Sequence, residues 1–205
     1  MTRTLIPGIL AMAAIVVASN ILVQFLFGNW LTWGAFTYPF AFLVTDIMNR
    51  LYGAAAARKV VLVGFATGLV CSLIGTQIIG EFGPLVTIRI AIGSGTAFLV
   101  AQLLDVAIFT RLRAGSWWRA PLVSSVIGGG VDTALFFAIA FSGTPGFIAP
   151  SVDVSWASEV LPILGFGPAA PLWVSLAIAD FGIKLAISLI ALIPFRLAII
   201  RLAAT

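Results

Sequence analysis

The chain has 205 residues, of which 61% are hydrophobic and only 9% are charged, and its formal net charge is +4. Its mean hydropathy is +1.18, and several apolar runs approach the roughly 20 residues that a helix needs to cross a bilayer. Lipid offers no hydrogen-bond partner to the backbone, so such segments fold as helices. The chain has no histidine, which argues against zinc chemistry, and its single cysteine, Cys71, excludes an intramolecular disulfide. The composition therefore predicts an all-α, polytopic membrane protein.

Apolar windows and helix breakers predict a bundle of six transmembrane helices in a single transmembrane domain covering residues 1–205. In chain order the predicted spans are residues 5–27, 30–50, 60–79, 84–109, 118–141 and 171–195. The first of these could pass for a signal peptide, but its apolar run continues to Phe27 and favours a span. The connections are short except for an external loop, 142–170, which is rich in Gly and Pro and is expected to contain a short interfacial helix around Trp156.

The distribution of basic residues predicts the orientation of the bundle. Lys and Arg gather before the first span, in alternate connections and after the last span, at Arg3, Arg50, Arg58, Lys59, Arg111, Arg113, Arg119, Arg196 and Arg201. The opposite side carries Glu81, Asp153 and Glu159, with Arg89 as its nearby basic residue. The positive-inside rule therefore places both termini in the cytoplasm. The basic residues are scattered and predict no nucleic-acid partner.

Several ionisable side chains lie inside the predicted spans, where each costs about 2.5–3.5 kcal/mol near a helix centre. They are Asp46, Arg50, Arg89, Asp105, Asp132, Asp180 and Lys184. Asp46 and Arg50, like Asp180 and Lys184, are spaced i, i+4 with the acid first, so that each pair could neutralise itself. Asp105 and Asp132 have no such neighbour, and a structural role for either would need a partner on another helix, such as Arg89 or Lys184. Buried charges of this kind face a cavity or one another, which makes them candidates for function.

Two short stretches repeat an acid–aromatic pattern. AQLLDVAIF and GGGVDTALF align Asp105 with Asp132 and Phe109 with Phe136, and in each the ring follows the acid by one helical turn. The pattern is typical of a pocket in which a carboxylate accepts hydrogen bonds from a flat heterocycle while a ring stacks on it. Chance is the alternative, because the chain contains 16 Phe. The glycines at 128–130 would allow close approach of either a substrate or a neighbouring helix.

The stretch TYPFAFLVTDIMNRLYGAAAARKVV combines Tyr-Pro, Thr-Asp, Asn, Tyr-Gly and a helix that begins with basic residues. It resembles the signature of the queuosine precursor transporter family, once labelled vitamin-uptake-like. The resemblance extends over nearly the whole chain, through Arg89, Ser94, AQLLDVAIF, WWRAPLVSSVIGGGVDTALFFAIAF and Lys184. It implies import of 7-deazaguanine-type precursors of queuosine for salvage into tRNA, with no catalytic residue, cofactor or metal. Family members often carry an amide shortly before the acid of span five; this chain has glycines there, although Gln102 retains an amide in span four.

A guanine-like base presents an N1–H and an exocyclic amine that one carboxylate can accept together. Either Asp105 or Asp132 is expected to accept them, and the residues alone do not rank the two. The ring of Phe109 or Phe136 would stack on the base. The remaining members of the expected substrate site are Arg89, Gln102, Ser94, Asp180 and Lys184. If an aminomethyl precursor is carried, a second carboxylate would offset its positive charge.

The end of the second span is expected to act as a gate or a structural lock rather than as a base-recognition site. Asp46 lies there with Asn49 and Arg50, and Tyr38 belongs to the same expected set. The Tyr38-Pro39 step is expected to break or bend the helix, because proline lacks a backbone N–H.

Two other interpretations remain open. A substrate-binding subunit of an energy-coupling-factor vitamin importer would need partner ATPase subunits, since no G-x-x-x-x-G-K-[ST] motif occurs. An intramembrane aspartyl protease would use Asp105 and Asp132 as two carboxylates sharing a proton, but Val131 interrupts the Gly-x-Gly-Asp pattern of that family. The expected partners are a small deazapurine and the lipid bilayer, and the residues leave both a homodimer and the choice between proton-coupled and facilitated transport open.

Overall fold

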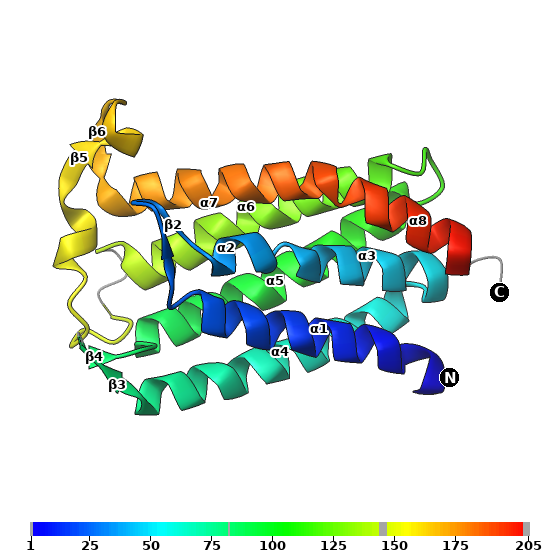
Figure 1. Ribbon diagram of the computed structural model, residues 1–205, viewed down its shortest axis with the longest axis horizontal. Helices are drawn as coiled ribbons and strands as arrows, with labels where there is room; N and C mark the ends of the chain where they lie inside the picture. Colours follow the sequence, from blue (N-terminus) through cyan, green and yellow to red (C-terminus); the bar gives the residue numbers. More distant parts are fainter. Residues whose placement is uncertain (1, 82, 144–146, 203–205) are drawn as a thin grey trace.

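The computed structural model describes residues 2–81, 83–143 and 147–202, with side chains from 5 to 201 within these ranges. Its long helices run side by side along one axis, and both ends of the chain lie at the same end of the bundle (Figure 1). These helices are α1 (Thr2–Leu22), α4 (Ala54–Gln77), α5 (Ile88–Leu112), α6 (Arg119–Phe141) and α7 (Leu172–Ile190). The predicted all-α architecture is confirmed at this level.

Five segments of the described chain are long and apolar enough to cross a membrane. They are Leu5–Leu22, Ala54–Gln77, Ile88–Leu112, Arg119–Phe141 and Leu172–Arg201, and they coincide with five of the six predicted spans. The fifth predicted span agrees with α6 to within one residue. The predicted start of the third span is too late, because Gly53, with a φ of 84°, ends the preceding helix and lets α4 begin at once.

The remaining predicted span, 30–50, is a broken helix. It consists of α2 (Gly34–Thr37) and α3 (Phe40–Tyr52), separated at the expected Tyr38-Pro39 step. Pro39 has no N–H for the helical ladder, and the amides of Ala41 and Phe42 donate instead to carbonyls three residues back, at 3.0 and 3.1 Å. The break therefore has the tighter hydrogen-bond pattern of a 3₁₀ turn.

Three short hairpins replace helix or coil at the end of the bundle opposite the termini (Figure 1). They pair β1 (Leu26–Phe27) with β2 (Leu31–Thr32), β3 (Ile79–Gly80) with β4 (Gly83–Pro84), and β5 (Val160–Pro162) with β6 (Ala169–Pro171). The expectation that the first span stays helical to Phe27 is wrong, because α1 ends at Leu22 and the chain turns into β1.

The expected external loop, 142–170, contains two short 3₁₀ helices besides β5, and its residues 144–146 lie outside the described residues. Trp156 lies in the first of these helices, Ser155–Ser158, where a short helix was expected; the second is Ile163–Gly165. The last span continues beyond its expected end, since α8 (Leu192–Leu202) follows α7 after a break at Ala191.

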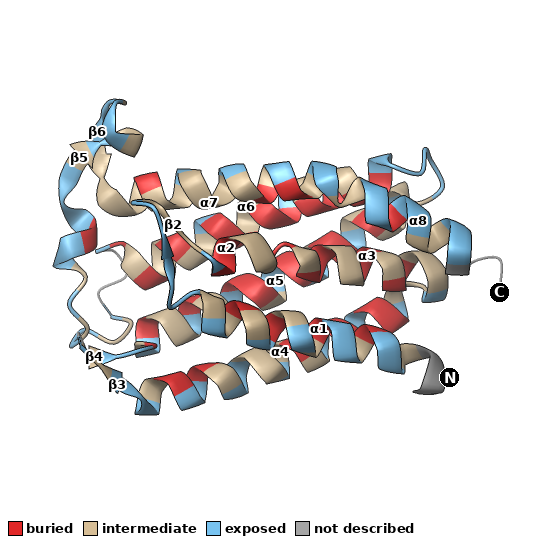
Figure 2. Ribbon diagram, viewed as in Figure 1, coloured by how far each residue is buried: buried red, intermediate tan, exposed pale blue. Residues whose placement is uncertain are grey.

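The bundle is apolar outside and partly polar inside. Buried residues follow the faces that the helices turn toward one another, whereas the outward faces are exposed (Figure 2). The exposed residues include large apolar side chains such as Leu10, Leu73 and Ile88, as a lipid-facing surface requires. The interior holds buried polar and charged side chains, among them Asp46, Arg89, Gln102, Asp105, Asp132 and Lys184.

Candidate functional site

Lys184 on α7 is the centre of a buried ionic cluster. Its ammonium group donates to Asp132 Oδ2 at 2.7 Å, to Asp180 Oδ2 at 2.5 Å and to Thr133 Oγ1 at 2.9 Å. Lys184 is 4% exposed and Asp132 is 3% exposed. All three ammonium protons are therefore used, in a place where an unpaired charge would be costly.

The helix break adds a third element to this cluster. Tyr38 lies at the break between α2 and α3, and its hydroxyl donates to Asp132 Oδ1 at 3.2 Å. Its ring centre is 5.7 Å from Lys184 Nζ, which is within the range of a cation–π contact. Thr133 donates in turn to Asp180 Oδ2 at 2.7 Å. We call Tyr38, Asp132, Thr133, Asp180 and Lys184 the Lys184 cluster; with both acids ionised, its two negative charges and one positive charge leave a net charge of −1.

A second polar group lies between α3, α5 and α6 and contains two carboxyl groups. Asp46 Oδ1 accepts from Ser124 Oγ and Asp46 Oδ2 from Ser125 Oγ, both at 3.3 Å. The carboxyl of Asp105 lies within hydrogen-bonding reach of that of Asp46, and within the described residues neither of its oxygens has a donor. We call these two residues the carboxylate pair.

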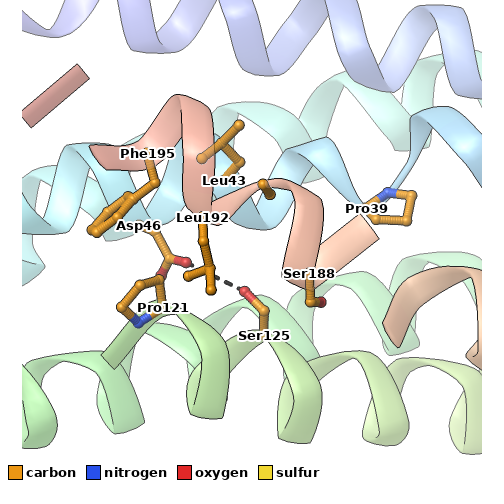
Figure 3. A pocket seen from close by; sticks show the side chains of 9 residues that line it. Pro39, Leu43, Asp46, Pro121, Ser125, Ser188, Leu192 and Phe195 are labelled. Carbon is orange, nitrogen blue, oxygen red and sulfur yellow. Dashed lines mark hydrogen bonds between the residues drawn. The ribbon is translucent and has the colours of Figure 1, made fainter. Parts of the chain in front are cut away.

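The carboxylate pair borders a small cavity. Figure 3 shows Asp46 and Ser125 beside it, with residues from the break at Pro39, from α6 and from the α7–α8 junction around them. The cavity measures about 10 Å³. This is close to the space that one water molecule needs and far below that of a bicyclic base.

The end of α3 is tied to α5 by hydrogen bonds rather than by an ion pair. Asn49 Nδ2 donates to the Val106 carbonyl and to Thr110 Oγ1, both at 3.1 Å. Arg50 donates to the Arg113 carbonyl at 2.5 Å, and Arg113 donates back to the Arg50 carbonyl at 3.3 Å. The self-neutralising pair of Asp46 and Arg50 that the spacing allows is thus not formed, since each side chain binds another helix.

Four of the expected site residues lie apart from the Lys184 cluster. Arg89 donates to the carbonyls of Ile139 and Ser142 and joins the start of α5 to the end of α6. Ser94 donates to the Ala91 carbonyl within its own helix. The rings of Phe109 and Phe136 pack edge-on against Phe195 and Phe137, at centroid distances of 6.0 and 5.1 Å. Of the contacts described for these four side chains, none reaches the cluster.

Gln102 and Gly128 show how α5 fits against α3 and α6. Gln102 Oε1 accepts from Thr45 Oγ1 at 2.6 Å. A Cβ atom at Gly128 would meet Phe42 Cε1 at 2.8 Å and Asp105 Cβ at 3.4 Å. This supports helix packing as the reason for that glycine. It also places Asp105 level with Gly128, which lies one turn from Asp132 on α6. The two carboxyl groups that face each other are those of Asp46 and Asp105, whereas the protease interpretation pairs Asp105 with Asp132.

The sequence reasoning missed Thr133, Ser124 and Ser125. Thr133 directly follows Asp132, and Ser125 precedes Asp132 by two helical turns and so faces the same side of α6. Small polar residues in helical register with a buried acid are the signal that could have found the serines. The contact between Tyr38 and Asp132 joins residues 94 positions apart, and no local pattern points to it.

The helical bundle is apolar outside, and its buried charges contact one another across helices. These two features are those of an integral membrane protein with a polar interior. Residues 32–199 match the family described as "Putative vitamin uptake transporter". The chain belongs to this family, as its signature predicted.

Curated relatives agree with this membership. The chain is 33% identical over 195 residues to the queuosine precursor transporter of Escherichia coli (strain K12), covering 88% of this chain and 79% of that protein. It is 35% identical over 174 residues to the probable queuosine precursor transporter of Haemophilus influenzae, covering 80% and 66%. A third relative, the probable queuosine precursor transporter of Bacillus subtilis (strain 168), is 31% identical over 192 residues, covering 84% and 73%. No solved structure matches the chain.

Proposed function

We propose that the protein imports queuosine precursors, bases of the 7-deazaguanine type, across the bacterial cytoplasmic membrane and is not an enzyme. The names of its relatives support this substrate class. The observation that carries the proposal is the Lys184 cluster, in which acids, a base and a phenol from three separate helical segments meet in the interior. Intramembrane ionisable groups that contact each other in this way mark substrate pathways.

The chemistry of the cluster fits a deazaguanine. Asp132 now accepts hydrogen bonds from Tyr38 and Lys184, one on each oxygen. A bound base would replace these two donors with its N1–H and its exocyclic amine, which lie side by side. Lys184 would then be free to donate to the carbonyl of the base. The net charge of −1 favours a precursor with a cationic aminomethyl group, which Asp180 would offset.

The broken helix supplies the sixth crossing of the proposed topology. Together α2, the break and α3 extend from Gly34 to Tyr52, about 28 Å of helix, which approaches the roughly 30 Å of a hydrocarbon core. The α5–α6 turn, with Arg111, Arg113 and Arg119 in or beside it, lies at the same end of the bundle as the two termini (Figure 1). The positive-inside rule supports a cytoplasmic location for this end. We treat residues 1–205 as one transporter domain on this basis.

Movement about the break at Pro39 would open the site. Tyr38 closes the Lys184 cluster from that break, and broken helices often form substrate sites in secondary transporters. At the other end of α3 the hydrogen bonds of Asn49 and Arg50 to α5 hold the cytoplasmic side shut. This assigns a lock to Asn49 and Arg50, and moves Tyr38 from the expected gate to the substrate site.

The test is restoration of queuosine in the tRNA of cells that cannot make the precursor, at matched membrane abundance of each variant. The parent protein should restore queuosine from supplied precursor. Asp132→Asn should lose most of this activity, because asparagine keeps the shape of the side chain but lacks the negative charge that accepts both donors of the base. Glu81→Gln, which removes an exposed carboxylate in the β3–β4 hairpin, is the matched control and should behave as the parent.

Two results would contradict the proposal. A correctly inserted parent that restores no queuosine would show that the substrate is wrong or that partner subunits are needed, as in an energy-coupling-factor importer. An Asp132→Asn variant as active as the parent would reduce the cluster to a structural role.

A further inference from the structure

Among the described side chains, the carboxylate pair has no basic partner, unlike the acids of the Lys184 cluster. Asp46 is 2% exposed and Asp105 is 0% exposed. Asp46 receives two long hydrogen bonds, from Ser124 and Ser125. Ser124 has one hydroxyl proton with Asp46, Asp105 and the Pro121 carbonyl all near it, so it can satisfy at most one of the two carboxyl groups. Within the described residues, neither oxygen of Asp105 has a donor in hydrogen-bonding geometry.

No described charge from the surrounding helices compensates the pair, because each nearby one is engaged elsewhere or exposed. Arg50, one turn beyond Asp46, donates to the Arg113 carbonyl. Asp132 on α6 is held by Lys184 of α7, and Arg196 on α8 lies over the ring of Trp117. Arg58 and Lys59 on α4 are exposed. The charged group that each carboxyl of the pair faces is thus the other carboxyl.

Two adjacent buried carboxylates without a cation cannot both be ionised, because like charges repel and each has lost its hydration. One proton resolves the conflict: a protonated carboxyl donates its O–H to the other, which provides a partner for an oxygen of Asp105. We propose that Asp46 and Asp105 form a proton-binding site, separate from the substrate site, that couples precursor import to proton entry. The coupling rests on the proposed function, whereas the proton site does not.

Two further features fit a proton that binds and leaves. The cavity in Figure 3 reaches Asp46 between α3, α6 and the α7–α8 junction and is the size of one water molecule, about 10 Å³. The fully buried Nε2 of Gln102, one turn before Asp105 on α5, has no acceptor within the described residues. Because the two carboxylates cannot remain ionised side by side, release of the proton has to coincide with a movement that separates them or lets water from the cavity reach them.

A single segment links the two sites. Tyr38, which binds Asp132, lies at the break just before α3, and Asp46 lies within α3. Thr45, beside Asp46, donates to Gln102 on α5. A movement of α3 about the break at Pro39 therefore changes the contacts of the substrate site and of the carboxylate pair together, which is what coupling requires.

Infrared difference spectroscopy of the purified protein in lipid, between acidic and alkaline pH, tests the proton site without any substrate. We expect the parent to show a carboxylic-acid carbonyl band at neutral pH, Asp46→Asn and Asp105→Asn each to shift or remove it, and the double variant to lack it. Asn resembles a protonated Asp in shape and uncharged state, so both variants should fold. Asp153→Asn, in the exposed loop, is the control and should keep the band. A parent without the band, or a band that persists unchanged in the double variant, would overturn the proposal.

Uptake of an aminomethyl deazaguanine into proteoliposomes tests the coupling. With the voltage clamped at zero, an inward proton gradient of one pH unit supports at most about tenfold accumulation for one proton per substrate. We expect the parent to concentrate the substrate and Asp105→Asn to stop at equal concentrations on the two sides. Accumulation driven by sodium instead, or by protons in both Asp variants, would overturn it. A parent that moves no precursor refutes the proposed function, while the infrared band still decides the proton site.

Discussion

At the scale of single residues, Lys184 decides the electrostatics of the interior. It joins an acid on its own helix, Asp180, to an acid on α6, Asp132. Neither acid has another basic partner within the described residues, so the cluster is held together by one ammonium group. Burial of a charge is tolerable only when it is paired and hydrogen-bonded, and Lys184 satisfies both conditions with three short contacts.

Lys184→Met should therefore destabilise the protein strongly. The apolar side chain leaves Asp132 buried without a cation, and removal of one partner of a buried ion pair typically costs about 3–5 kcal/mol. Thermal unfolding of the purified protein in detergent measures the effect. Combining Lys184→Met with Asp132→Asn should recover part of the loss, because the uncompensated charge is then gone. A single variant that unfolds at the temperature of the parent would show that the pair is not structurally important.

The sequence identified most of the charged members of this cluster, but it left open which of them contact one another. Asp132, Asp180 and Lys184 were identifiable because a charged residue inside an apolar span is costly and is usually kept for a function or an ion pair. The i, i+4 ion pair of Asp180 and Lys184 is confirmed. The same spacing failed for Asp46 and Arg50, because the carbonyl of Arg113 at the end of α5 competes for the guanidinium. Local spacing cannot rank an acceptor on another helix, since that depends on how the helices pack.

At the scale of elements, the close contact of α6 with α3 and α5 depends on Gly128. Its Cα–H faces the ring of Phe42 and the carbonyl of Ala101, so that a methyl group there would lie 2.8 and 3.3 Å from them. This contact brings Ser124 and Ser125, one turn earlier on α6, to Asp46. Helix packing and the hydrogen bonds of the carboxylate pair thus rest on the same small residue.

Gly128→Ala should lower the free energy of unfolding by about 1–3 kcal/mol, the usual cost of overpacking a well-packed interior. The matched control is Gly182→Ala on α7, where an added Cβ meets nothing within 4 Å. The control should be neutral or stabilising by up to about 1 kcal/mol, because alanine is the better helix former. Unfolding of both variants in detergent is the measurement, and equal stability of the two would contradict the packing argument.

The sequence predicted the ends of helices correctly where a strong helix-breaking residue was present. Pro39 predicted the break in the second span, and Trp118 to Phe141 matches α6 closely. The hairpin of β1 and β2 was not predicted, because the apolar residues on either side of the connection at 28–29, such as Leu26 and Leu31, were assigned to the two flanking spans. Strands of two residues give no periodic signal, and their pairing is decided by where α1 and α2 end.

At the scale of the whole molecule, the bundle separates its charges between two ends. The termini and the α5–α6 turn lie at one end, and the three hairpins with the long loop lie at the other (Figure 1). The basic residues of the connections are concentrated at the first end, whereas Glu81, Asp153 and Glu159 belong to the second. The sequence predicted this separation of charges from charge counts alone, and the arrangement of the helices agrees with it.

Labelling of single cysteines tests the orientation. Cys71 is the chain's one native cysteine, so Cys71→Ala gives a background without thiols. In that background Ser116→Cys places a thiol in the exposed α5–α6 turn and Ser151→Cys in the exposed long loop. In right-side-out membrane vesicles an impermeant maleimide should label Ser151→Cys and should label Ser116→Cys only after the membrane is permeabilised. The reverse pattern would invert the topology.

The pairing of Asp132 with Lys184 also has a consequence for biosynthesis. The two residues lie on α6 and α7, which the long loop separates, so α6 is synthesised well before its charge partner. Until Leu172 and the rest of α7 follow, α6 carries an acid into the membrane that costs about 2.5–3.5 kcal/mol to place near the centre. Asp180 and Lys184, one turn apart, enter together and partly neutralise each other. The cost of this acid is thus offset by its partner only once α7 is in place, and a ribosome that stalls within the loop leaves the nascent chain with an acid it cannot yet pair.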